Sequence, residues 1–106
     1  GVEEKAGGDN ELMKVVVQNF LEEIPSDVEA MNEAISNDNP TLEYQYAHKM
    51  KPNLQLFGLE LMAEVKVIES WAKAGRKKDE VPQAAAKITK KVKVAGIALR
   101  RDFELE

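Results

Sequence analysis

Apolar side chains recur every three or four positions along most of this chain of 106 residues. That spacing places them on one face of an α-helix, whereas a half-buried strand would alternate apolar and polar residues. The pattern occupies five segments, which are residues 10–24, 26–37, 40–58, 59–74 and 82–103. No segment has the strand pattern. We therefore expect an all-α protein of five helices joined by short connections.

Each segment has a set of apolar residues that we expect to face the core. In the first two segments these are Leu12, Met13, Val16, Val17, Phe20, Leu21 and Ile24, followed by Val28, Met31, Ala34 and Ile35. In the third they are Leu42, Tyr46, Met50, Leu54 and Phe57. In the last two they are Leu61, Val65, Ile68, Trp71 and Ala72, then Val81, Ala85, Ile88, Val92, Ala95, Leu99 and Phe103.

Local signals divide the first part of the chain into two helices. Asp9 is a suitable N-cap for the first helix. Pro25 interrupts that helix, because proline lacks the backbone N–H that a helix interior needs. Ser26 and Glu29 have the spacing of a capping box, which begins a second helix. Residues 1–8 are small and acidic, so we expect a linker or disordered lead-in before a domain that covers residues 9–104.

Similar signals bound the next two helices. Asn39 is the expected N-cap of the third helix, and Pro40 suits its first position. Gly58 and Gly75 are expected to end the third and fourth helices, because glycine readily adopts the left-handed conformation that follows many helices.

Composition narrows the class of protein. A chain that is 43% hydrophobic and 32% charged suits a folded domain rather than a disordered one. Its net charge of −4 argues against nucleic-acid binding, and the absence of cysteine excludes disulfides and thiolate metal sites. No apolar run approaches the length of a membrane span. We expect a cytoplasmic monomer that does not insert into membranes.

His48 is the only histidine in the chain and the first candidate for chemistry at neutral pH. It lies two residues before Met50, which belongs to the apolar face, so the two side chains should point in nearly opposite directions. His48 therefore falls on the polar face of the third helix, together with Tyr44, Lys51, Pro52 and Gln55.

The segment around His48 resembles the phospho-accepting helix of histidine-containing phosphotransfer (HPt) domains. Their motif has a histidine, an apolar residue two positions later, a lysine at the third position, small residues at the fourth to sixth, and a glycine at the tenth. Met50, Lys51 and Gly58 match the second, third and tenth positions. Pro52 and Leu54 depart from the motif, and Pro52 is expected to kink the helix just after His48.

The resemblance implies a fold and a reaction. HPt domains are antiparallel four-helix bundles with an additional N-terminal helix across one end. Their histidine accepts a phosphoryl group from a receiver-domain aspartate and passes it to another such aspartate, without ATP-dependent kinase activity. The resemblance implies that the partner is the receiver domain of a response regulator or of a hybrid sensor histidine kinase. This domain can itself be part of such a kinase. The Mg²⁺ needed for transfer is expected on the receiver domain.

Particular residues take roles under this interpretation. His48 is the phospho-acceptor, and Lys51, one helical turn later, contacts the phosphoryl oxygens. The docking surface for the partner comprises Tyr44, Lys49, Pro52 and Gln55. No intrinsic cofactor or metal is expected, because the sequence has no glycine-rich phosphate loop and no cluster of ligands around His48.

Two other classes of function remain open. The chain could be a non-catalytic helical interaction module whose surface histidine is inert. A helical carrier of a metal or small molecule is less favoured, because one histidine and scattered carboxylates give no ligand spacing. The last helix also carries a basic run, which is either a solvated face or a patch for an acidic partner or anionic lipid. Its members are Lys87, Lys90, Lys91, Lys93, Arg100 and Arg101.

Overall fold

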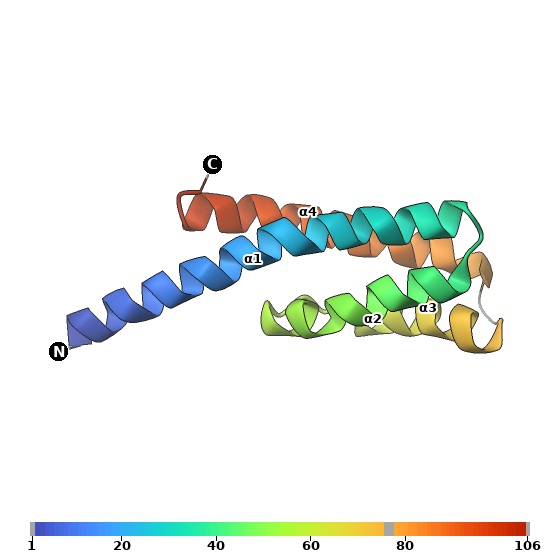
Figure 1. Cartoon of the computed structure of the whole chain (residues 1–106), viewed down its shortest axis with the longest axis horizontal. Coiled ribbons are helices and arrows are strands. Elements are labelled where there is room, and N and C mark those ends of the chain that lie inside the picture. Colours follow the sequence, from blue (N-terminus) through green and yellow to red (C-terminus); the bar gives the residue numbers. More distant parts are fainter. Residues whose placement is uncertain (1, 76–77, 106) are drawn as a thin grey trace.

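Four α-helices and one short 3-10 helix follow one another along the chain (Figure 1). They are α1 (Val2–Ser36), α2 (Pro40–Leu56), α3 (Met62–Ala74), η1 (Lys78–Glu80) and α4 (Val81–Asp102). The computed structural model describes residues 2–75 and 78–105, with side chains from residue 11 onward. These ranges contain no strand, so the predicted all-α class is confirmed.

Each helix packs against two others, in a closed order. α1 contacts α2 and α4, and α3 contacts the same two helices from the other side. In Figure 1, α1 and α4 form the upper pair and α2 and α3 the lower pair. The short connections make successive helices antiparallel.

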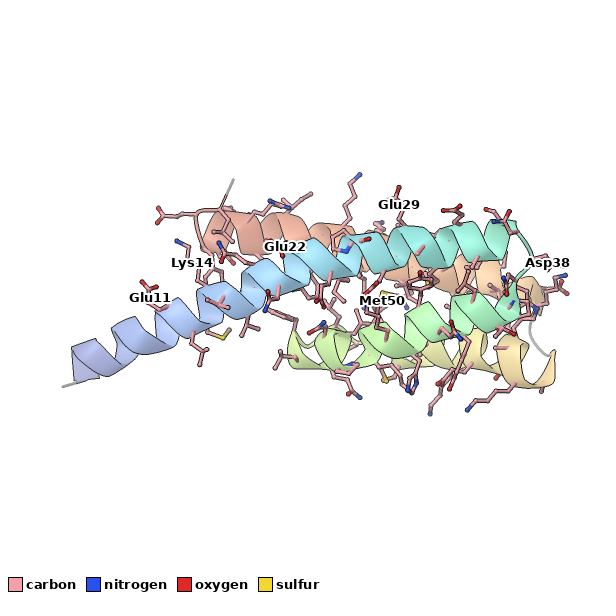
Figure 2. The ribbon with its side chains drawn as sticks, in the orientation of Figure 1. Glu11, Lys14, Glu22, Glu29, Asp38 and Met50 are labelled. Carbon is pink, nitrogen blue, oxygen red and sulfur yellow. The ribbon has the colours of Figure 1, made fainter. Side chains whose placement is uncertain are left out.

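The core lies between the four helices and uses most of the residues predicted for it. Buried residues from every helix form a single cluster, whose members are Phe20, Ile24, Val28, Met31, Ala47, Met50, Leu54, Leu61, Val65, Ile68, Ala85, Ile88 and Val92. Figure 2 shows Met50 of α2 between that helix and α1. Trp71 is also buried, at the end of the core near Gly75.

The predicted break at Pro25 is wrong, because α1 is one continuous helix through that position. Ile24 and Val28, on either side of the proline, are buried against the same core. Burying the whole apolar stripe on one straight face outweighs the hydrogen bond that Pro25 removes. Ser26 is exposed inside the helix and caps nothing, so the expected separate N-terminal helix is absent.

The beginning of the chain also differs from the prediction. α1 starts at Val2, so residues 2–8 are helical rather than a linker, and Asp9 is not an N-cap. Gly1 lies outside the described residues. Leu12 and Met13, which we expected in the core, are exposed. Figure 1 shows the reason, because the N-terminal part of α1 extends past the ends of the other helices.

The later helix ends agree with the sequence signals. The Asn39 side chain accepts a hydrogen bond from the backbone N–H of Leu42 at 3.1 Å, which caps α2 ahead of Pro40. Gly58 and Gly75 both have positive φ, at 69° and 65°, where a side chain would be strained. The fourth predicted helix begins later than expected, at Met62, and the predicted loop at residues 76–80 contains η1, with residues 76–77 outside the described chain.

A carboxylic acid occupies a core position that the sequence did not suggest. Glu43 is fully buried, whereas its neighbour Leu42, predicted to face the core, is 38% exposed. Glu43 precedes Met50 by seven residues, two helical turns, so it lies on the same side of α2. Neither carboxyl oxygen has a hydrogen-bond partner in the described part of the chain, and burial raises the pKa of Glu43 from 4.5 to about 8.

Replacing Ser26 by alanine tests the continuity of α1. In a continuous helix the change removes only an exposed hydroxyl, so the free energy of unfolding should stay within about 0.5 kcal/mol of wild type. A capping box at Ser26 would instead make S26A lose about 1 kcal/mol. Urea denaturation followed by the fluorescence of Trp71 measures the difference.

The buried carboxyl of Glu43 should make stability depend on pH. Because its pKa is higher in the folded state than in the unfolded state, the folded protein keeps a proton that the unfolded chain releases. Its contribution is fully present below the unfolded pKa and is lost as the pH rises toward 8. Between about pH 5 and about pH 7, wild type should lose roughly 1.4 kcal/mol per pH unit more than Glu43→Gln. The free energy of unfolding of both proteins would be measured by denaturation at each pH. If it changed with pH in the same way for wild type and Glu43→Gln, the raised pKa of Glu43 would be contradicted.

Candidate functional site

His48 lies on the exposed side of α2, midway along the helix. Tyr44, one turn earlier, stacks on the imidazole with ring centroids 5.6 Å apart and an angle of 25° between the rings. Residues four apart on a helix are neighbours, so the stack follows directly from the sequence spacing. The tyrosine covers one face of the imidazole and limits how the ring can turn, while the residue as a whole remains open to solvent.

A cation from α3 lies against Tyr44. The Lys73 ammonium is 5.4 Å from the centre of the Tyr44 ring, within the range of a cation–π contact. Lys73, Tyr44 and His48 therefore form a row that crosses from α3 to the outer side of α2. We refer to this row as the His48 row.

Lys51 forms an ion pair instead of pointing freely to solvent. Its ammonium is 3.2 Å from a carboxylate oxygen of Glu69 on α3, and the two side chains are only 29% and 16% exposed. The Lys51 charge is thus held on the α3 side of the imidazole. A phosphoryl group on His48 would have to share this ammonium with Glu69.

Lys49 is held on the opposite side of α2. Its ammonium lies 3.1 Å from Asp27 of α1, and this hydrogen bond raises the pKa of Lys49 above its ordinary value. Asp27 is itself buried, and its second carboxyl oxygen has no partner among the described residues. Of the predicted docking residues, Lys49 is therefore the one that is paired with α1, although its side chain is still 58% exposed.

Pro52 and Gln55 extend the exposed surface beyond His48. Both are exposed, and α2 continues through Pro52 as far as Leu56. The Gln55 amide lies 3.7 Å from the sulfur of Met62 at the start of α3. The structure brings His48, Tyr44, Pro52 and Gln55 onto one outward surface of α2.

Three residues of this site were not found from the sequence. Glu69 and Lys73 come from α3 and Asp27 from α1, and each is at least 18 positions away from the residue it contacts. No local pattern marks them, because a charged residue on a helix has no fixed partner until the helices pack. Gly58 has a structural role, because its positive φ lets the chain turn after the end of α2, ten residues beyond His48.

The site offers one nucleophile, the His48 imidazole, and several cations.

Neither the described part of the chain nor comparison with known proteins adds a further feature to the site. In residues 2–75 and 78–105 no group of three or more histidine or acidic side chains is placed to hold a metal ion. Within the same ranges, no helix combines the length and apolar character needed to cross a bilayer. No protein-family model, curated protein or solved structure matches the chain.

The Lys51–Glu69 pair should couple α2 to α3 measurably. Lys51→Met and Glu69→Gln each break the pair, and the double variant removes both charges. A double-mutant cycle in urea denaturation should give a coupling energy of about 0.5–1 kcal/mol, since the pair is partly screened from solvent. A coupling energy near zero would mean that the pair does not hold the two helices together.

Proposed function

We propose that this chain is a phosphorelay intermediate that carries a phosphoryl group on His48. The proposal includes the fold expected for HPt domains, an antiparallel four-helix bundle, with α1 serving as both the first bundle helix and the N-terminal extension. The observation that carries it is the position of the sole histidine, exposed midway along α2 and stacked on Tyr44. The match of Met50, Lys51 and Gly58 to the HPt motif supports the same function.

The exposed ring suits transfer between two aspartates. One nitrogen of the neutral imidazole attacks the phosphorus of an aspartyl phosphate, and the N–P bond forms as the bond from phosphorus to the aspartate oxygen breaks. The aspartate leaves as a carboxylate, and the imidazole keeps its proton on the other nitrogen. The second transfer reverses these steps on another aspartate. A nucleophile on a well-anchored helix keeps its approach direction constant in both steps.

The ion pairs of α2 support this use of the helix. Lys49 ties α2 to Asp27 on α1, and Lys51 ties it to Glu69 on α3. Once phosphorylated, His48 places a doubly charged group one turn from the Lys51 ammonium, which can then contact the phosphoryl oxygens. Lys73 adds a second cation on the α3 side of the row.

The partner would provide what this chain does not. A receiver domain contributes the phosphorylated aspartate and the Mg²⁺ that neutralises charge during transfer. Its docking surface on this chain comprises Tyr44, Lys49, Pro52 and Gln55, around the imidazole. Pro52 has a short, rigid side chain, so it leaves the approach to the ring open.

One observation favours the alternative of a non-catalytic interaction module. Lys51, the proposed phosphoryl contact, is already paired with Glu69. If that pair does not open, His48 is an ordinary surface histidine and the surface around it only binds a partner. The following experiment separates the two functions.

Wild-type protein should acquire one phosphoryl group at His48. We would incubate it with phosphoramidate, which donates to exposed imidazoles directly, and separately with a receiver domain charged by labelled acetyl phosphate and Mg²⁺. We expect acid-labile, base-stable label on wild type with both donors and none on His48→Gln. Gln83→Ala, an exposed change on α4 at a residue that makes no contact with the site, should be labelled like wild type.

The two donors give distinct outcomes. Label that persists in H48Q would overturn the assignment of the acceptor. Label from phosphoramidate but from no receiver in a broad panel would support the interaction module, because the imidazole would then be reactive but never presented to a phosphorylated aspartate.

A further inference from the structure

A groove follows the junction of α1 and α4 on the side of the molecule opposite the α2–α3 pair. Three hollows of about 320, 620 and 550 Å³ lie along it. The central one is lined by Leu21, Pro25 and Val28 of α1 and by Val92, Gly96 and Ile97 of α4. We call this outward surface of the two helices the α1–α4 face.

The centre of the α1–α4 face is apolar and only partly filled. Ile97 is 60% exposed at the edge of the groove. Gly96 has no side chain, so α1 and α4 pack closely here and no side chain from this position fills the groove. A Cβ at Gly96 would lie 3.5 Å from a methyl group of Leu21. An exposed isoleucine beside an apolar hollow is a suitable centre for a protein interface.

Opposite charges border the two sides of this apolar centre. α1 contributes the exposed carboxylates of Glu22, Glu29 and Glu33, and α4 contributes the exposed ammonium groups of Lys90 and Lys93. None of these five has an ion-pair partner in the part of the chain that the structure describes. By contrast, Lys49, Lys51 and Lys87 are each paired with an acidic residue of another helix. Figure 2 shows Glu29 on the side of α1 that points away from α2.

The acidic and basic residues lie at the same levels along the two helices. A hydrogen bond of 3.0 Å between Asn32 and Thr89 fixes the register of α1 against α4. Because the helices are antiparallel, Glu29 lies near the level of Lys93, and Glu33 lies near the level of Lys90. Each level of the face therefore carries a negative charge on α1 and a positive charge on α4.

This arrangement is complementary to itself. A two-fold axis parallel to the helices would place α1 of one copy over α4 of another, with the same levels facing each other. Glu29 and Glu33 of one copy would then oppose Lys93 and Lys90 of the second copy. Ile97 of each copy would lie near the level of Pro25 and Leu21 of the other, where the groove can receive it.

From these observations we infer that the α1–α4 face binds the same face of a second copy of this chain. A purely acidic partner would be repelled by the α1 carboxylates, and a purely basic one by Lys90 and Lys93. An anionic membrane would meet the same acidic stripe and would not fill a groove. A partner surface that carries basic residues opposite α1 and acidic residues opposite α4 is complementary to this face. The α1–α4 face of a second copy is such a surface.

The dimer does not depend on the proposed phosphorelay function. His48 and the other members of its row lie on α2 and α3, which the α1–α4 face does not include. Pairing through α1 and α4 leaves His48 exposed in both copies. The inference also goes beyond the sequence, from which we expected a monomer.

Sedimentation velocity over a wide range of protein concentrations tests the inference. At low salt the mass should rise from 11.8 kDa toward twice that value as concentration increases, and added salt should weaken the association severalfold. Ile97→Asp should raise the dissociation constant of the dimer at least about thirtyfold, because it places a charge at the apolar centre.

Val94→Asp is the matched control for Ile97→Asp. Val94 is on the same helix and is 58% exposed, but it lines a different hollow, on the side of α4 next to the α2–α3 turn. V94D should dimerise like wild type. Circular dichroism and thermal unfolding would show that both variants are folded.

Charge reversal gives a second, sharper test. The variant K90E/K93E carries only acidic residues at the two charged levels and E29K/E33K only basic ones, so each alone should be monomeric. Mixed in equal amounts, they should form a heterodimer that is tighter than the wild-type dimer. Wild type that remains monomeric at every concentration, dissociation by V94D equal to that by I97D, or a mixture that stays monomeric would each overturn the inference.

Discussion

The continuous apolar stripe of α1 is the constraint on which the rest of the structure depends. Phe20, Ile24, Val28 and Met31 lie on one side of a single helix and are almost completely buried. Burying each such side chain is worth about 1.5–3 kcal/mol, whereas a proline in a helix interior costs about 3 kcal/mol. The stripe therefore outweighs Pro25, and α1 remains one helix that packs against both α2 and α4.

The same packing gives α2 two different sides. Its inner side includes Met50 and Leu54, together with a buried carboxyl at Glu43 that lacks a hydrogen-bond partner among the described residues. Its outer side carries His48, and ion pairs to Asp27 and Glu69 anchor the helix on either flank. An exposed imidazole on an anchored helix combines accessibility with a fixed orientation, which is what repeated transfer between partners requires.

The molecule also has two sides of different chemical character. The α2–α3 side presents a histidine, an aromatic ring and several paired cations, while the α1–α4 face presents an apolar groove between acidic residues of α1 and basic residues of α4. A net charge of −4 conceals this separation, because the acidic excess lies on α1 and the basic excess on α4. The first side suits a partner that brings its own metal and aspartate, and the second suits a surface with mirrored charges.

The sequence by itself determined the helical class, the later helix ends and the outward position of His48. Asn39, Gly58 and Gly75 act through backbone groups only a few residues away, and the helical period places His48 opposite Met50 whatever surrounds them. Only the tertiary structure decided that α1 continues through Pro25, that Glu43 is buried, and that Lys51 pairs with Glu69. These features depend on side chains from distant parts of the chain, whose separation in space no local pattern specifies. The groove between α1 and α4 has the same origin, because it exists only once the first and last helices of the chain lie side by side.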